Sequence, residues 1–218
     1  MISLLGPSQF VNILHDFGLN NPDIDKNASP VLCLGPCEVS VGEMTSAYTT
    51  FANNGIRCAP LYVTKIEDSH GNVLAKFQPL MTEVISSASA NQMLEMLMAV
   101  VNGGTASRLH RYLNYTGDIG GKTGTTNNNS DGWFLGITPE LVNGCWVGGE
   151  DRDIRFESTA LGQGASTALP VWAYYMQLVY ADKRLGYHPS AKFNLPPNFN
   201  PCAVADTLSI NGIQEEFF

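Results

Sequence analysis

Residues 119–148 constrain the fold most, because three strand-like runs follow one another there with short connections. The runs occupy residues 119–125, 132–138 and 141–148. Only Pro139 and Glu140 separate the second run from the third, so these two strands must be antiparallel neighbours. The first run contains a polar Gly-Lys-Thr-Gly-Thr segment at residues 121–125, and an Asn/Ser-rich stretch follows at residues 127–130. The sequence therefore predicts an antiparallel sheet that carries a polar segment on its first strand.

The residue types of this segment suit the binding of an anionic peptide end. Lys122 supplies a positive charge, and the hydroxyl of Thr123 can donate a hydrogen bond to a carboxylate. Gly124 has no Cβ atom, so a peptide can lie close to the strand backbone. A Gly/Thr-rich turn before a buried strand is the alternative interpretation, and the wider sequence decides against it.

Several other segments carry a family resemblance. Residues 34–48 read Leu-Gly-Pro-Cys-Glu-Val-Ser-Val-Gly-Glu-Met-Thr-Ser-Ala-Tyr, and residues 51–55 read Phe-Ala-Asn-Asn-Gly. Residues 100–106 read Val-Val-Asn-Gly-Gly-Thr-Ala, and residues 169–172 read Leu-Pro-Val-Trp. Together with Lys-Thr-Gly, and in this order, they resemble the transpeptidase domain of class A penicillin-binding proteins. The resemblance covers most of residues 1–182, whereas residues 183–218 are predicted to be a Pro/Asn-rich C-terminal tail.

The resemblance implies a serine-type D-Ala-D-Ala transpeptidase that cross-links bacterial peptidoglycan. In this family a serine attacks the D-Ala-D-Ala end of a stem peptide, and the acyl group then passes to a neighbouring stem amine. β-Lactam antibiotics acylate the same serine. By resemblance, the substrate-binding residues are Lys122, Thr123, Gly124 and Thr125, with catalytic roles for Lys122 and for Thr125, whose amide is an oxyanion donor. No cofactor is implied.

The nucleophile that the family requires is absent from this sequence, because no Ser is followed by Lys three residues later. Ser89-Ala90-Asn91 fits the family's Ser-x-Asn motif, but an apolar-periodic run begins there, and Ser89 with Gln92 is typical of a capping box. We therefore expect the C-terminal part of the domain, with Met1 an internal methionine of a longer protein. A catalytically inactive binding or interaction module is the alternative function, and a serine β-lactamase-like hydrolase is a less favoured one.

The expected fold class is α/β (α+β), with an antiparallel central sheet flanked by helices, as in the transpeptidase/β-lactamase-like family, and incomplete at the N-terminus. Periodicity and capping signals predict helices over residues 7–17, 40–53, 89–102 and 169–180, and a hairpin over residues 61–77. On the last helix, the residues predicted to pack on the sheet are Val171, Trp172, Tyr175 and Leu178. In the family, the strand matching residues 141–148 pairs with an upstream strand, so we expect an exposed edge there.

Composition excludes other classes of function. The net charge is −8, from 12 Lys+Arg and 20 Asp+Glu, which argues against a nucleic-acid partner. Five Cys are too few for a disulfide framework, which leaves small buried thiols, one disulfide or, least favoured, a metal ligand. The four His are scattered, with no i, i+4 pair and no nearby acidic partner, so we expect no metal site and no catalytic dyad.

The resemblance places the complete protein at the periplasmic face of the bacterial inner membrane. Residues 1–7 have no positively charged region and no long apolar region, so they are not a signal peptide. No run reaches the about 20 apolar residues that a membrane span needs. We therefore expect membrane contact only through a missing N-terminal anchor, and stem peptides and β-lactams as the partners of the site.

A first prediction concerns covalent chemistry. Because acylation needs the missing serine, residues 1–218 are expected not to form a covalent adduct with a fluorescent penicillin. The measurement is in-gel fluorescence after denaturation, followed by mass spectrometry of any labelled peptide. A denaturation-resistant label on one of the serines of this chain would show that the chain has its own nucleophile.

Overall fold

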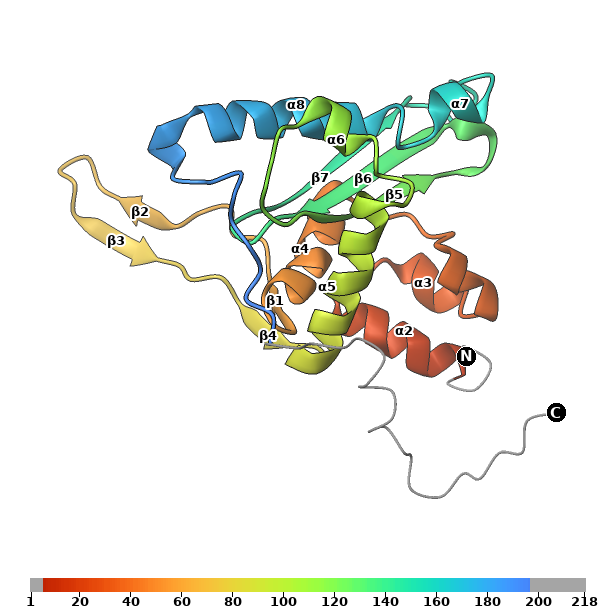
Figure 1. Cartoon of the computed structure of the whole chain (residues 1–218). Helices are drawn as coiled ribbons and strands as arrows, with labels where there is room; N and C mark the ends of the chain where they lie inside the picture. The colour runs from red at the N-terminus through yellow and green to blue at the C-terminus, as the bar shows by residue number, and fades with distance from the viewer. Residues whose placement is uncertain (1–5, 197–218) are drawn as a thin grey trace.

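The computed structural model describes residues 6–196 of the 218-residue chain (Figure 1). The first part is mainly helical and also contains short strands. Its elements are α2 (Pro7–Asp16), α3 (Pro22–Lys26), η1 (Pro30–Leu34), α4 (Val41–Ala52), β1 (Ile56–Cys58), β2 (Lys65–Glu67), β3 (Val73–Lys76), β4 (Met81–Glu83), α5 (Ser87–Asn102) and α6 (Leu109–Tyr112). The sheet and its last helices follow, as β5 (Gly120–Thr125), η2 (Asn127–Asn129), β6 (Asp131–Ile137), β7 (Val142–Gly148), α7 (Thr159–Gly162), α8 (Ala168–Ala181) and η3 (Lys183–Leu185).

The three predicted strands form one antiparallel sheet in the order β5-β6-β7. Thr123 lies opposite Phe134 in the first pair of strands, and Phe134 lies opposite Cys145 in the second. Helix α8 lies on one side of this sheet, and α4 and α5 lie on the other (Figure 1). The mixed α/β fold with an antiparallel sheet between helices is confirmed. Within residues 6–196, β5 and β7 are the two edges of the sheet.

The contact between α8 and β6 forms the centre of the largest apolar core. The rings of Phe134 and Trp172 are fully buried and meet edge to face, with their centroids 5.2 Å apart. A Cβ atom on Gly136 would lie 2.3 Å from the Trp172 ring, so only glycine permits this approach of the helix to the strand. Deleting a buried Trp or Phe side chain typically costs about 3–5 kcal/mol. This contact therefore fixes how α8 lies on the sheet.

The predicted sheet-facing side of α8 is wrong except at Trp172. Val171, Tyr175 and Leu178 are 51%, 47% and 72% exposed. The side chains that face the core are instead those of Leu169, Trp172, Ala173, Met176 and Val179. The helix is apolar on most of its surface, so its periodicity did not indicate which side the sheet would cover.

Two helix starts show how local sequence sets the boundaries. Ser40 and Glu43 form the predicted capping box, because the Ser40 hydroxyl accepts from the Glu43 amide and the Glu43 carboxylate accepts from the Ser40 amide. Helix α5 begins earlier than predicted, since Ser86 is its N-cap and accepts from the amide of Ser89. The prediction of Ser89 as the cap is wrong by one turn, but Ser89 does lie at a helix start.

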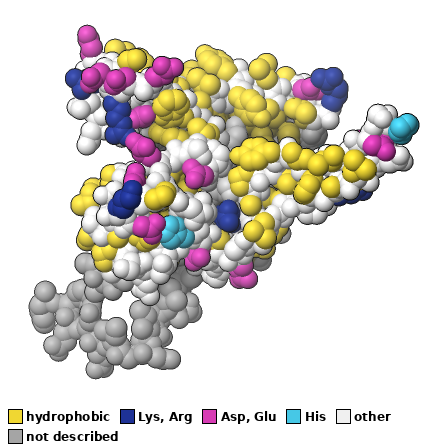
Figure 2. All heavy atoms as spheres, turned by 180° about the vertical axis from the view of Figure 1, so that it is seen from behind, with side chains coloured by type: hydrophobic (Ala, Val, Ile, Leu, Met, Phe, Trp, Pro, Cys, Tyr) yellow, Lys and Arg dark blue, Asp and Glu magenta, His cyan; other side chains and the backbone are white. Residues whose placement is uncertain are grey.

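The predicted hairpin is an arm that projects from the body (Figure 1). Asp68 holds its turn by accepting from the amides of His70 and Asn72. Figure 2 shows apolar side chains gathered along this arm and over the part of the body where α8 lies. The exposed apolar side chains of the arm and of α8 include Ile66, Val73, Leu74, Phe77, Val171, Tyr174, Tyr175 and Leu178.

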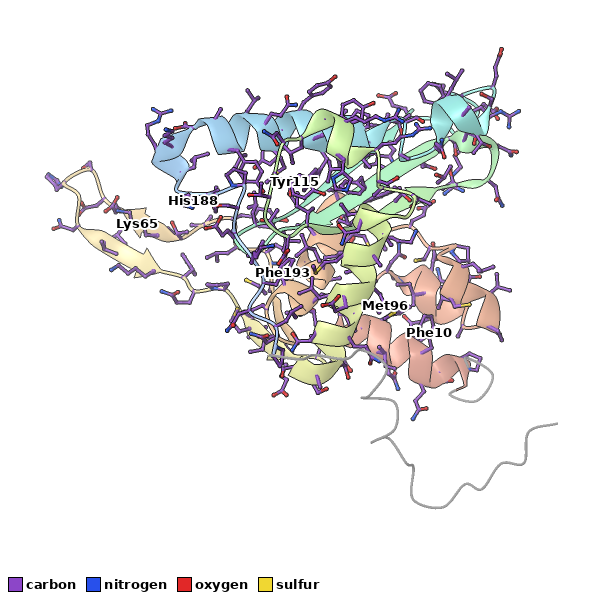
Figure 3. All side chains as sticks on the ribbon, in the orientation of Figure 1. Phe10, Lys65, Met96, Tyr115, His188 and Phe193 are labelled. Carbon is purple, nitrogen blue, oxygen red and sulfur yellow. The ribbon has the colours of Figure 1, made fainter. Side chains whose placement is uncertain are left out.

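The chain after α8 returns to the body instead of leaving it. The amides of Thr116 and Gly117 donate to the carbonyl of Pro189, at 3.0 and 2.8 Å. Phe193, labelled in Figure 3, and Leu195 pack beside Leu97 of α5. The described part of the predicted tail, residues 183–196, therefore covers part of the apolar cluster formed by Leu94, Leu97 and Ile137.

Strand β7 generates a prediction about association. Its outer edge is unpaired in the described chain, and Trp146 on it is 40% exposed, so we expect residues 1–218 to self-associate. Trp146→Lys replaces an apolar edge residue with a cation and should shift the chain toward monomer in analytical ultracentrifugation. Leu178→Lys makes the same kind of change on the exposed side of α8 and is the matched control. A parent chain that sediments as a monomer would contradict the prediction. If only Leu178→Lys shifted the chain toward monomer, the self-association would occur through α8 and not through β7.

Candidate active site

The polar segment lies on β5, and its orientation follows from the strand pairing. The amide of Thr126 donates to the carbonyl of Asp131, across to β6, at 3.2 Å. Because amide directions alternate along a strand, the amides of Gly124 and Lys122 also face β6, whereas those of Thr123 and Thr125 face the outer edge. Within the described residues no strand pairs with that edge. The Thr125 amide therefore points to where a peptide strand can add, as an oxyanion donor requires.

Lys122 lies at the same edge. Its side chain is exposed, and Nζ donates to the carbonyl of Thr123 at 2.7 Å. That carbonyl faces away from β6, so the ammonium group lies beside the backbone that an added strand would contact. The positive charge predicted for the site is thus positioned at the outer edge of β5, on the backbone carbonyl of Thr123.

The two threonine side chains of β5 are both held by neighbouring loops. The hydroxyl oxygens of Thr123 and Thr105 are 2.7 Å apart. The hydroxyl of Thr125 accepts from the amide of Gly164 at 3.1 Å. The structure therefore brings all four predicted residues, Lys122 to Thr125, onto one strand edge and fixes two of their side chains from outside the strand. The roles of these residues in catalysis stay predictions.

Thr105 and Gly164, which hold the hydroxyls of Thr123 and Thr125, were not identified from the sequence. Thr105 belongs to residues 100–106, which contribute only to the family resemblance, and Gly164 is not singled out in the sequence. Arg108 and Ser166 connect these two loops, because Nη1 of Arg108 donates to Oγ of Ser166 at 2.7 Å. Thr105, Ser107 and Arg108 follow Gly103 and Gly104 closely, and this polar cluster after a glycine pair was the only feature of the sequence that could have indicated a functional loop.

Asp131 closes the polar network where β6 begins. Its carboxylate accepts from Trp146 Nε1 at 2.9 Å and from the hydroxyls of Thr126 and Ser130 at 3.0 Å each. Partial burial acts to raise the pKa of Asp131, but these hydrogen bonds and the charge of Arg152 outweigh it and lower the pKa. Asp131 thus stays ionised and ties the β5–β6 turn to β7, so it both orients the strand entry and holds the turn.

The cysteines and histidines of the described chain do not form a second site. Cys33, Cys37, Cys58 and Cys145 are free thiols in residues 6–196, and Cys33 is exposed, so the prediction of small buried thiols fails there. No group of three or more His, Cys, Asp or Glu in that range could hold a metal ion. None of the described helices has both the length and the apolar character needed to span a bilayer.

Two histidines do have acidic partners that the sequence did not reveal. His15 Nε2 lies 3.0 Å from Asp25 Oδ1, and His188 Nδ1 lies 3.5 Å from Glu140 Oε1. The expectation that no acid lies near a histidine is therefore wrong, because these pairs form across 10 and 48 residues of sequence. Figure 3 labels His188, which lies in the segment after α8.

Comparison with known proteins places this geometry in a family. A family model described as the penicillin-binding protein transpeptidase domain matches residues 3–147. The chain belongs to the penicillin-binding protein transpeptidase family. Among similar proteins, penicillin-binding protein 1A of Aquifex aeolicus is 38% identical over 178 residues, which are 78% of this chain and 23% of that protein. Penicillin-binding protein 1A of Rickettsia conorii is 28% identical, over 92% of this chain and 26% of that protein.

Solved structures agree with the fold. Penicillin-binding protein 1A from Haemophilus influenzae matches with a TM-score of 0.74 and 27% identity, over 90% of this chain and 33% of that chain. PonA1 from Mycobacterium tuberculosis, solved with penicillin V, matches with a TM-score of 0.65 and 22% identity, over 84% of this chain and 50% of that chain. The family predicted from the sequence, the transpeptidase domain of class A penicillin-binding proteins, is confirmed. The chain spans about a quarter of the length of the two curated relatives described above.

The Asp131 network makes a prediction about pH. A carboxyl group whose folded pKa lies below its unfolded value of about 3.9 stabilises the fold at higher pH and loses this effect as pH falls through the folded pKa. The indole N–H of Trp146 donates to this carboxylate, so its ¹⁵N NMR signal reports the protonation of Asp131. The signal should stay constant down to about pH 4 and shift only below it. Asp131→Asn should remove that titration and broaden the signals of residues 126–130. A shift centred above pH 4 would contradict the lowered pKa of Asp131.

Proposed function

We propose that this chain supplies the substrate-binding strand of a serine-type D-Ala-D-Ala transpeptidase that cross-links peptidoglycan. The observation that carries the proposal is the unpaired outer edge of β5, where the Lys122 ammonium lies on the outward carbonyl of Thr123, the Thr123 hydroxyl is held by Thr105, and the Thr125 amide faces outward. This arrangement supports the binding of an extended peptide that ends in a carboxylate. The family membership supports the reaction class, which is acyl transfer.

Each group has a separate task in the proposed reaction. The stem peptide adds as a strand along β5, and its terminal carboxylate accepts from Lys122 and from the hydroxyl of Thr123. The Thr125 amide donates to the oxyanion that forms when a serine attacks the carbonyl of the penultimate residue. That serine comes from a part of the protein outside this sequence, which contains no Ser-x-x-Lys. No cofactor takes part.

β-Lactams would enter the same site, because they carry a carboxylate and an amide carbonyl in a similar arrangement. The solved complex of PonA1 with penicillin V gives a precedent in a structural neighbour. The proposal also includes the periplasmic face of the bacterial inner membrane as the working place, reached through an anchor in the remainder of a longer protein.

A second candidate function is a binding or interaction module without catalysis. The observation that favours it is the missing Ser-x-x-Lys, since a strand edge with a carboxylate site can bind a peptide without reacting. A serine β-lactamase-like hydrolase is the third candidate, and it too needs the missing serine. Covalent labelling of a longer protein that contains this chain distinguishes the first candidate from the second.

The proposed roles are tested in a protein that joins this chain to an upstream transpeptidase segment with the serine. Thr123→Val keeps the side-chain size and removes the carboxylate-binding hydroxyl. A charge-assisted hydrogen bond contributes about 1.5–3 kcal/mol, so penicillin acylation should slow roughly 10- to 150-fold. Lys122→Ala should slow it at least as much. The measurement is the second-order rate of acylation by a fluorescent penicillin.

Matched controls come from strands that lie outside the site. Thr82→Val on β4 and Lys65→Ala on the β2–β3 arm make the same chemical changes away from β5. Both should acylate at the parental rate. Parental rates for Thr123→Val and Lys122→Ala would mean that the β5 edge does not bind the carboxylate, and the proposed function would fail.

A further inference from the structure

We propose that Thr105 is a positioning residue that orients the hydroxyl of Thr123 toward the substrate carboxylate. The inference deepens the proposed function and rests on it. Its starting point is the contact between the two hydroxyl oxygens, 2.7 Å apart across 18 residues of sequence. Thr105 is exposed and Thr123 is half-buried, and neither belongs to an apolar core cluster of the described residues.

The number of hydroxyl protons decides which threonine donates in the contact between Thr105 and Thr123. A threonine hydroxyl has one proton to donate and two lone pairs to accept, whereas an ionised carboxylate only accepts. When Thr123 donates its proton to the substrate carboxylate, it has no proton left for Thr105. Thr105 must then donate to Oγ1 of Thr123. The pair thus works as a chain from Thr105 through Thr123 to the carboxylate, and each hydrogen bond polarises the next.

The loop that carries Thr105 is built to hold it in place. Ala106 is fully buried, and its amide donates to the carbonyl of Val100 at 3.1 Å. The amide of Gly104 donates to the same carbonyl, also at 3.1 Å. A Cβ atom on Gly104 would lie 2.8 Å from the Cα atom of Val100, so the loop can close this tightly only with glycine. Thr105 sits between these two anchored residues and has little freedom to move.

A second loop completes the arrangement around β5. Arg108 donates to Ser166, and the Ser166 hydroxyl donates to the carbonyl of Ala160 at 2.9 Å. Two residues before Ser166, the amide of Gly164 donates to the hydroxyl of Thr125. The loop of residues 103–108 and the loop of residues 163–166 are therefore joined to each other, and each fixes one hydroxyl of the strand. These contacts hold the two loops at the positions from which the Thr105 hydroxyl reaches Thr123.

The test measures binding of a small probe to the 218-residue chain. Saturation-transfer difference NMR observes the ligand, so it also works if the chain self-associates. The probe is N-acetyl-lysyl-D-alanyl-D-alanine, and the control probe is the same peptide with a C-terminal amide. The parent chain should bind the carboxylate form more tightly than the amide form.

Four variants separate a positioning role from a structural one. Thr105→Val should weaken binding of the carboxylate probe about fivefold, since it removes one uncharged hydrogen bond, while Thr105→Ser should bind like the parent. In a Thr123→Val background, Thr105→Val should have no further effect, because Thr105 acts through Thr123. Ser107→Ala, a hydroxyl deletion two residues away in the same loop, should bind like the parent. If Thr105→Val does not give a folded amide spectrum, Thr105→Ala replaces it.

The outcomes separate the two proposals. If the parent prefers the carboxylate probe and Thr105→Val binds it equally well, the positioning role is overturned while the proposed function stands. An undiminished effect of Thr105→Val in the Thr123→Val background also overturns it. If the parent chain does not distinguish the two probes, the carboxylate site itself is wrong, and the role of Thr105 falls with it.

Discussion

The close approach of α8 to β6 is the constraint on which the rest of the structure depends. Glycines make it possible, because a Cβ atom on Gly136 would lie 2.3 Å from the Trp172 ring and one on Gly132 would lie 2.0 Å from Oγ1 of Thr167. With the helix held this close, the loop before it also lies against the sheet, and the Gly164 amide reaches the hydroxyl of Thr125. A bulkier residue on β6 would lift the helix and the loop together, and the β5 edge would lose one of its two anchors.

The site combines a rigid backbone with exposed chemistry. Gly121 and Phe134 meet in the buried part of the β5–β6 pair, while Lys122 one residue later is exposed. Polar groups at an edge stay hydrated before substrate arrives, so they impose no burial penalty on the fold. Their positions come from elsewhere, through Thr105 and Gly164. The strand can therefore expose a charge and two hydroxyls at fixed positions without burying polar groups in the core.

The sequence predicted what short-range patterns determine. The turn at residues 139–140 required antiparallel β6 and β7, and Ser40 with Glu43 marked the start of α4. Prediction from the sequence failed where the local sequence fits several alternatives equally well. Helix α8 is apolar on most sides, so its buried side had to be chosen by the shape of β6, and several serines lie near the start of α5, so the cap was misplaced. The contact of Thr105 with Thr123 was not predictable, because it depends on how a loop and a strand meet in space.

The two edges of the sheet differ in the chemistry that they expose. The β5 edge carries an ammonium group, hydroxyls and outward amides, which is the polar chemistry on which the proposed peptide site depends. The β7 edge carries the 40% exposed side chain of Trp146, which is the apolar kind of edge that favours pairing with another strand. Asp131 connects the edges, since it accepts from Trp146 on β7 and from Thr126 at the end of β5. The carboxylate of Asp131 therefore links the start of β6 both to β7 and to the end of the strand that carries Lys122.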